Sequence, residues 1–310
     1  MAVNKKGIFF TFAAITLSVV LILSFNVYKT YEMEEKAEVI GTRVTTINNF
    51  IKDIEQDLEK GLFIASFRSF MSMGQYIASN GTFIANVEDS FNELVLQGTL
   101  NSQELSLMKE STFTDWADKI EVQADKIGII VNFTILDVSI NQTDPWSVVI
   151  DSNINIDVMD KKNTSSWNRN KSIITKVSIE NFEDPLYVIN SQGRVINGII
   201  QSPFTYFVAG EDISNLLEHI NNSYYIQSNT SPNYLMRLQG IISNSSTGIE
   251  SLVNIKKFQD QGITAQDRSA VDYIYFGTQS TTNYRINGTP VWFKLDSGHL
   301  ETYGVQNMTI

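Results

Sequence analysis

The chain has 310 residues, of which 43% are hydrophobic and 18% are charged, and its formal net charge at pH 7 is -11. A hydrophobic content of this size excludes a disordered chain, and the acidic balance disfavours nucleic acid as a partner. The absence of cysteine excludes disulfides, thiolate chemistry and cysteine-type zinc sites. At ~150 residues per domain, the length predicts two packed units or one large elongated unit.

An uncharged stretch, Gly7 to Phe25, lies between Lys5-Lys6 and Lys29. A helix needs roughly 20 apolar residues to cross a bilayer core, because every backbone polar group must be satisfied within the segment. We therefore expect a transmembrane helix over residues 7–28, rather than a buried core helix, which usually carries a polar stripe. The bulky residues of Ser24 to Tyr28 do not fit a signal-peptide cleavage site, so a permanent anchor in the lipid bilayer is expected.

The basic residues that flank this stretch leave its orientation open. Lys5-Lys6 on one side are balanced by Lys29, Lys36 and Arg43 on the other, and the positive-inside rule gives a near tie. A short tail, residues 1–6, is easier to leave in the cytoplasm than to export. We therefore expect a cytoplasmic N-terminus and an extracytoplasmic remainder.

After the anchor, apolar residues recur at alternating steps of four and three. They are Ala37, Ile40, Val44, Ile47, Ile51, Ile54 and Leu58. This spacing predicts an amphipathic helix whose stripe either packs on the chain's own sheet or forms a coiled-coil seam. We favour packing on the chain's own domain; in the alternative, the helix from Ala37 to Leu58 mediates self-association or binds other surface proteins. From Leu62 to Ile77 the apolar face widens, which predicts a buried helix that ends near Asn80-Gly81.

Two further helices are predicted before the sheet. Residues from Ile84 to Leu94 have helical apolar spacing, and this helix should stop at Gly98. Asn101 and Glu104 have the spacing of a capping box for the next helix. The buried face of that helix should comprise Trp116, Ile120, Ala124 and Ile127.

From Gly128 the apolar period changes from 3.6 to 2, which predicts an antiparallel meander with one wet face. A slip of phase after Ile135 predicts a β-bulge. A change of composition near Asn181 to Pro185 marks a boundary between a helical stalk plus meander, residues 29–181, and an α+β subdomain, residues 182–310. The predicted fold class is therefore α+β, with the transmembrane helix continuing into a long amphipathic helix.

The search for catalytic and metal-binding motifs gives weak candidates. The sequence has no HExxH motif, Walker loop or G-x-S-x-G motif, and we expect no catalytic, cofactor or metal site. His219 falls off the apolar stripe of its helix and should be solvated. The alternating row from Asp151 to Asp157 could supply oxygen ligands to Ca²⁺, but strand spacing disperses them, so a solvated face is favoured. An anchored enzyme is the third functional choice, since folding could assemble carboxylates such as Asp184 or Glu211.

The Asn-x-Ser/Thr motif occurs ten times, about twice as often as the composition gives by chance, and never before residue 80. Two explanations are open: glycosylation of an external domain, which we favour, or the ordinary use of Asn, Ser and Thr in turns. The candidate acceptors are Asn80, Asn132, Asn141, Asn163, Asn170, Asn221, Asn229, Asn244, Asn287 and Asn307.

The order of Lys5-Lys6-Gly7, an apolar helix that runs on into an amphipathic one, and an antiparallel sheet resembles the layout of type IV pilin-like proteins. That resemblance implies cleavage after Gly7 by a membrane peptidase and packing of the helix in a filament core. The acidic residue usual in that family five places after the cut would be Phe12 here. Three strings are similar to an uncharacterised family of archaeal membrane-anchored proteins, a likeness that implies no known activity: Asp184 to Tyr187, Gly248 to Asn254 and Val271 to Phe276.

These patterns predict a single-pass membrane-anchored protein whose extracytoplasmic body acts in structure or interaction, as a pilin-like component of the cell surface. The alternative is an extracytoplasmic ligand-binding or sensory domain that uses a pocket between the two halves. A transmembrane sensor needs a cytoplasmic output module, which a six-residue tail does not provide.

Overall fold

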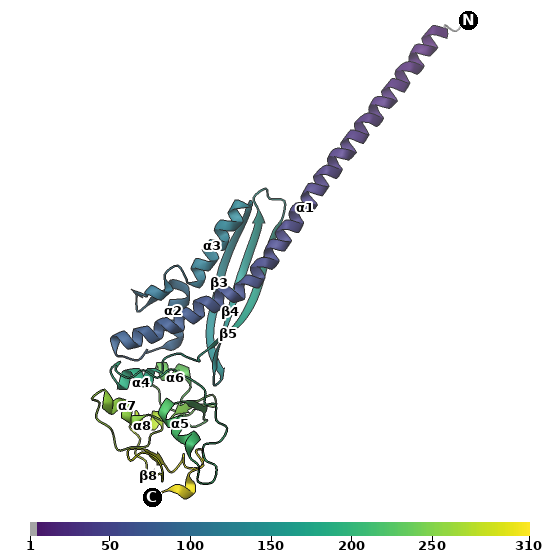
Figure 1. The fold of residues 1–310 in the computed structure, drawn as a ribbon. Coiled ribbons are helices and arrows are strands. Elements are labelled where there is room, and N and C mark those ends of the chain that lie inside the picture. Colours follow the sequence, from purple (N-terminus) through teal and green to yellow (C-terminus); the bar gives the residue numbers. More distant parts are fainter. Residues whose placement is uncertain (1–4) are drawn as a thin grey trace.

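The computed structural model describes residues 5–310, with side chains from Phe9 onward, so most of the predicted tail lies outside the described residues. Helix α1 (Lys5–Asn80) is 76 residues long. It extends from the N-terminal tip of the molecule along the sheet to the C-terminal unit, which gives an elongated molecule with its termini at opposite ends (Figure 1). The predicted α+β class, with a long apolar N-terminal helix, is confirmed.

Two helices and a three-stranded sheet accompany α1 in the first unit. They are α2 (Val87–Gln97), α3 (Phe113–Lys126), β3 (Ile129–Asp144), β4 (Ser147–Asp160) and β5 (Ser166–Ser178). Between α2 and α3 lie β1 (Thr99–Leu100), β2 (Gln103–Glu104) and the short 3-10 helix η1 (Ser106–Met108). The C-terminal unit consists of short elements: α4 (Pro185–Asn190), α5 (Ser214–Asn222), β6 (Tyr225–Gln227), α6 (Tyr234–Leu238), β7 (Ile249–Ser251), α7 (Ile255–Asp260), α8 (Asp272–Tyr275), β8 (Asn283–Arg285), β9 (Lys294–Asp296) and η2 (Gln306–Met308).

The apolar stripe of α1 packs on the chain's own domain from Ile47 onward. Ile47, Ile51, Ile54 and Leu58 are all buried in the main hydrophobic core, where each side chain contributes roughly 1.5–3 kcal/mol. Nearer the N-terminus, Ala37 and Ile40 stay exposed. The predicted stripe is therefore buried in its second half, from Ile47 to Leu58, and is exposed to solvent in its first half, around Ala37 and Ile40.

Arg43 marks the point where α1 enters the body. Its guanidinium donates to Asp160 Oδ1 at 3.0 Å and to the carbonyl oxygen of Gly128 at 2.7 Å. These bonds tie the helix to the two turns at one end of the sheet, those after α3 and after β4. The stretch of α1 before Arg43 has no such support from the body, and its side chains are exposed.

The sheet is an antiparallel meander in the order β3-β4-β5, as predicted. The register between β3 and β4 shifts between Ile135 and Asp137, which is where the β-bulge was predicted. α3 packs along β3 and α1 along β5, so the inner side chains of β4 are buried in strict alternation with partly exposed outer ones. The outer face is polar along most of its length, as in the rung where the Asn155 amide donates to Asn170 Oδ1 at 2.7 Å. Hydrophobic side chains are also exposed on it, namely Ile130, Met159 and Ile174.

Two local predictions are wrong. The capping box at the start of α3 is formed by Thr112 and Asp115. Asn101 instead lies in the β1–β2 turn with a positive φ, and Glu104 lies in β2. The widened apolar face of α1 is only half buried, because Phe63, Ile64 and Met71 remain exposed. Helix α2 ends as expected, with Gly98 in the left-handed conformation at φ 73°.

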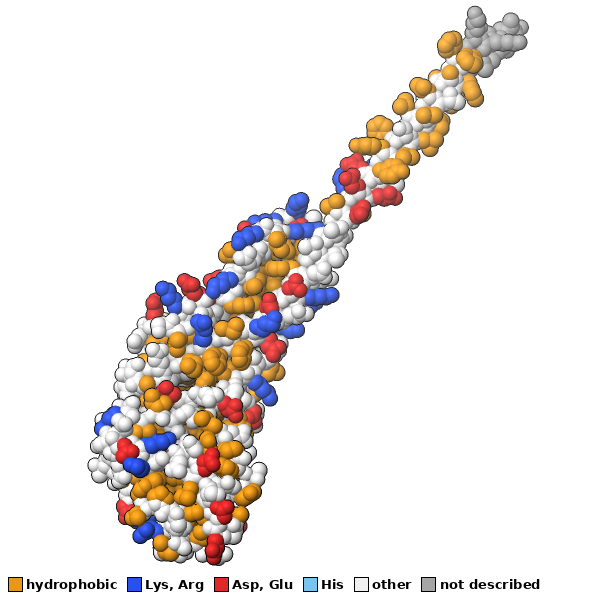
Figure 2. Space-filling model, viewed as in Figure 1, with side chains coloured by type: hydrophobic (Ala, Val, Ile, Leu, Met, Phe, Trp, Pro, Cys, Tyr) orange, Lys and Arg blue, Asp and Glu red, His pale blue; other side chains and the backbone are white. Residues whose placement is uncertain are grey.

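The N-terminal half of α1 can be a membrane anchor. Within residues 9–310, one helix is long and apolar enough to cross a bilayer, with a mean hydropathy of 2.1 in its best window and none of that window buried. Figure 2 shows this segment as a rod of hydrophobic side chains that ends at a belt of charged ones.

Ile47 and Ile40 lie on the same stripe of α1 but differ in exposure, so substitutions at the two positions test whether the stripe is buried. Replacing Ile47, which has an exposed fraction of 0%, by Asp should lower the free energy of unfolding by several kcal/mol, because a charge would be buried without a partner. Ile40→Asp is the control, since Ile40 lies on the same stripe but is 47% exposed, and it should change stability by less than about 0.5 kcal/mol. Thermal unfolding of both variants measures this, and equal stability would show that the stripe is not buried at Ile47.

Candidate functional site

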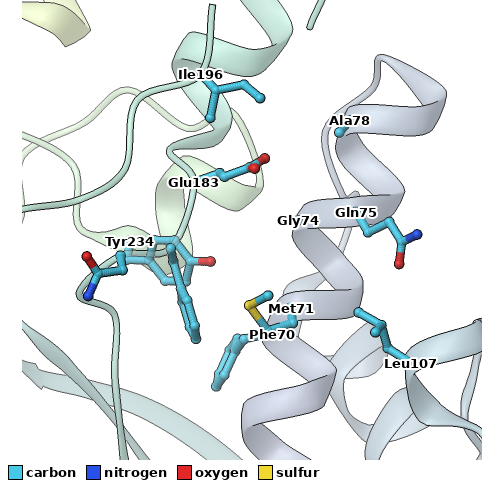
Figure 3. Close-up of a pocket in the computed structure, with 11 residues that line it drawn as sticks. Phe70, Met71, Gly74, Gln75, Ala78, Leu107, Glu183, Ile196 and Tyr234 are labelled. Carbon is cyan, nitrogen blue, oxygen red and sulfur yellow. The ribbon is translucent and has the colours of Figure 1, made fainter.

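The best candidate site is a groove between the last turns of α1 and the first segment of the C-terminal unit (Figure 3). It has a volume of about 480 Å³, within the range of ligand-binding clefts. Eleven residues line it: Phe70, Met71, Gly74, Gln75, Ala78, Leu107, Asn181, Phe182, Glu183, Ile196 and Tyr234. The lining is mainly apolar, and Glu183 contributes a carboxylate.

The floor of the groove is one face of α1. Met71, Gly74 and Ala78 succeed each other along this face, and a Cβ atom added at Gly74 would meet nothing within 4 Å. The helix therefore leaves open space where a larger side chain would project. At the base of the groove, the rings of Phe70 and Tyr234 lie edge to face with their centroids 6.3 Å apart.

The opposite wall is the segment from Asn181 to Glu183, and the next residue fixes it in place. Asp184 is fully buried, and its Oδ1 accepts the backbone N–H of Leu186 and so caps α4. Its Oδ2 accepts a hydrogen bond from Tyr225 at 2.7 Å and pairs with Arg237 at 2.6 Å. The wall of the groove is therefore anchored in the core of the C-terminal unit.

Arg237 is the centre of this buried cluster. Its guanidinium also pairs with Asp272 at 2.9 Å and donates to the carbonyl oxygen of Ile249, while Asp272 accepts from the Ser251 hydroxyl at 2.7 Å. Burial raises the pKa of Asp272, and the charge of Arg237 acts against that shift. Arg237, Asp184 and Asp272 have no exposed side-chain surface, so the cluster positions α6, β7 and the groove wall and does not itself meet a ligand.

A second buried cluster surrounds His299. Its Nδ1 lies 2.8 Å from Asp296, its Nε2 lies 3.3 Å from Glu250 Oε2, and the Tyr273 hydroxyl is 3.1 Å from the same Nε2. Burial alone would lower the pKa of His299, but the two carboxylates raise it to about 10. His299 is therefore an imidazolium at neutral pH, and it balances charges that the core would otherwise hold unpaired.

The expectation that His219 is solvated is wrong. His219 is fully buried on α5, with its ring 4.7 Å from that of Phe207 and its Nδ1 3.1 Å from the Ser202 hydroxyl. Burial lowers its pKa to about 3, so it is neutral at physiological pH. The apolar-stripe argument failed here because loop residues, which helical spacing does not describe, cover that side of the helix.

The structure does not assemble the other carboxylates considered into an accessible site. Asp184 is buried in its ion pair while Glu211 is exposed, so the two do not form one constellation. The row from Asp151 to Asp157 lies along the wet face of the sheet. Across residues 9–310, no group of three or more His, Asp or Glu side chains is placed to hold a metal ion.

The sequence predicts two kinds of modification, glycosylation at ten asparagines and cleavage after Gly7. All ten candidate acceptor asparagines are exposed. Gly7 lies in the first turn of α1, and cleavage after it stays a prediction. Sequence reasoning placed a pocket between the two halves only as an alternative, and it did not name the residues that line the groove, because it treated the whole face from Leu62 to Ile77 as buried.

Comparisons with known proteins give no match to a family model, to a curated protein or to a solved structure.

The Arg237 cluster predicts a large effect of one substitution. Arg237→Met leaves two buried carboxylates without their cation and should lower the free energy of unfolding by about 3–5 kcal/mol. Arg285→Met is the matched control, because Arg285 is exposed and its removal should cost little. Chemical denaturation measures both, and a stable Arg237→Met protein would contradict the assigned role.

The two histidines predict opposite pH dependences. The raised pKa of His299 stabilises the fold fully below pH 6.5, and this contribution, on the order of a few kcal/mol, is lost as the pH rises through about 10. The lowered pKa of His219 costs stability only as the pH falls from 6.5 towards 3.

His299→Gln should therefore flatten the alkaline side of the curve of melting temperature against pH, and His219→Gln should flatten only the acid side. Identical curves for the wild type and His299→Gln between pH 7 and 10 would contradict the charged state of His299.

Proposed function

We propose that this chain is a single-pass membrane-anchored protein whose body, residues 44–310, lies outside the cytoplasm and acts in structure or interaction. The observation that carries the proposal is the placement of the ten glycosylation motifs. All ten acceptor asparagines are exposed, whereas eight of the other seventeen asparagines of the described chain are partly or fully buried. An oligosaccharide can be attached to a folded protein only at an exposed side chain, so this selectivity supports an external, modified surface.

The distribution of the motifs along α1 agrees with this topology. None lies in the apolar segment or in the exposed segment that follows it, residues 29–42, and the first stands at Asn80, where α1 ends. At 1.5 Å per residue, the exposed segment is roughly 20 Å long. It would hold the body clear of the headgroups, so that both units face the exterior.

The pilin-like layout is a narrower proposal. In its favour are the unbroken α1 and the apolar N-terminal half that the body leaves uncovered. Because Ile47 to Leu58 are buried under the chain's own sheet, contacts with other subunits through the predicted stripe would use its free part, around Ala37 and Ile40. An archaeal source and processing at Gly7 belong to the same narrower proposal.

A ligand-binding or sensory role is the second candidate, and one observation favours it. The groove of about 480 Å³ lies between the two halves of the chain, where that alternative places its pocket. Its apolar floor and its single carboxylate, Glu183, suit an amphipathic ligand that carries a positive charge.

The topology is tested on intact cells. We expect added protease to digest the body while the N-terminal segment stays with the membrane, and the mass of the isolated chain to exceed the 35.0 kDa of the polypeptide. Asn170→Gln should lower that mass by one glycan. Asn168→Gln is the control, because Asn168 is exposed on the same strand but lies outside any motif.

Two results would contradict the proposal. One is a body that resists external protease but is digested after lysis, and the other is a chain that leaves the membrane on alkaline washing.

A further inference from the structure

A second apolar stripe follows the free face of α1, on the side away from the buried one. Its members are spaced 3, 4, 3 and 4 residues apart, which is the repeat of a coiled-coil seam. Ile64 is 51% exposed, Phe67 40% and Met71 42%. We call this stripe the outer seam; it comprises Ile64, Phe67, Met71, Gly74 and Ala78.

The outer seam is bordered by apolar side chains of the neighbouring elements. Ile174 of β5 and Ile196 of the C-terminal unit are among the most exposed hydrophobic residues of the body. Leu107 borders the seam from η1 and is also exposed. Figure 3 shows Ile196 and Glu183 on one side of α1 and Leu107 towards the other.

Two hollows lie end to end along the seam. The groove described above has about 480 Å³, and a shallower hollow between Lys60, Ile64 and Ile174 has about 760 Å³. Three aromatic rings join them: those of Phe63 and Phe67 are stacked with their centroids 6.3 Å apart, and those of Phe67 and Phe182 are tilted with their centroids 5.5 Å apart. Counted from Lys60 to Ala78, the surface is roughly 27 Å long, which is the scale of a polypeptide partner.

Several of the most exposed hydrophobic side chains of the body gather on this surface. Apolar patches on soluble monomers rarely exceed a few hundred Å². Ile64, Ile174 and Ile196 are each more than half exposed on this surface, and a standard stable interface buries ~800 Å² on each partner. Hydrophobic side chains also gather over the middle of the body on the face shown in Figure 2.

We propose that a second copy of this chain covers the outer seam in a parallel twofold dimer. The inference rests on the proposed membrane anchor: two copies held in one bilayer point the same way, at the same height, with the seam facing sideways. A twofold axis along α1 then brings each seam residue against its own counterpart. Gly74 and Ala78 allow the two helices to approach closely at the end far from the membrane.

Charge at the borders fits this arrangement. Arg68 lies on the Leu107 side, where it donates to the Leu107 carbonyl oxygen at 3.1 Å, and no acidic side chain of the described residues pairs with it. Glu183 lies on the Ile196 side and, within residues 9–310, makes no side-chain ion pair. In a parallel twofold dimer, each border of the outer seam lies against the opposite border of the partner. Arg68 of one copy therefore faces Glu183 of the other, and Leu107 faces Ile196.

The glycosylation motifs leave the surface clear. No motif falls between Lys60 and Ala78, or at Leu107, Ile174 or Ile196. The residues of the outer seam and its borders therefore carry no candidate glycan themselves.

The absence of cysteine makes a direct test possible in the full-length chain in its membrane. Met71→Cys and Ile64→Cys should each form a disulfide-linked dimer under mild oxidation, since a disulfide requires Cα atoms about 4.4–6.8 Å apart. Val122→Cys is the control: Val122 is 56% exposed on α3, away from the seam, and should stay monomeric. Adding Phe67→Asp to the Ile64→Cys chain should lower the dimer yield about tenfold or more, because a charge would stand in the middle of the apolar contact.

The dimer is overturned if neither seam cysteine links to its own counterpart, if Val122→Cys links equally well, or if the seam cysteines link only to a different polypeptide. A chain that stays in the membrane without such a link contradicts the dimer alone. Release from the membrane on alkaline washing contradicts the anchor, and the yield of the link still decides the dimer.

Discussion

The burial of one side of α1 under the sheet is the contact on which the rest of the molecule depends. Ile47, Ile51, Ile54 and Leu58 join a helix of 76 residues to the meander, and each contributes roughly 1.5–3 kcal/mol. Because the helix is continuous, this contact also sets the direction of the apolar half and the position of the C-terminal unit. A single element thus links a membrane-compatible segment, an exposed rod and a folded core.

The C-terminal unit depends on a different kind of interaction. Its helices and strands are short, and its centre holds two ionic clusters, one around Arg237 and one around His299, each with two carboxylates. Buried ion pairs contribute little net stability but are costly to break. They therefore act by selecting one arrangement of short segments, including the wall of the groove that faces α1.

Regular periodicity explains most of what could be predicted from the sequence. The stripe from Ile47 to Leu58, the bulge after Ile135 and the end of α2 at Gly98 follow from local spacing and turn chemistry. Prediction failed where tertiary neighbours decide: His219 is buried by loop residues, and Met71 is exposed because no element covers that side of α1. The ionic clusters join residues that are far apart in the sequence, such as Asp184 and Asp272, and no local sequence pattern predicts such pairs.

Amide hydrogen exchange of the full chain in lipid nanodiscs tests the central claim most directly, namely that one helix passes through membrane, solvent and core. We expect three zones along α1: slow exchange over residues 9–27, fast exchange over residues 29–42, and slow exchange from Val44 to Ile77, since exposed helical bonds open more readily than buried ones. Fast exchange over residues 9–27, or uniform protection through residues 29–42, would contradict the account.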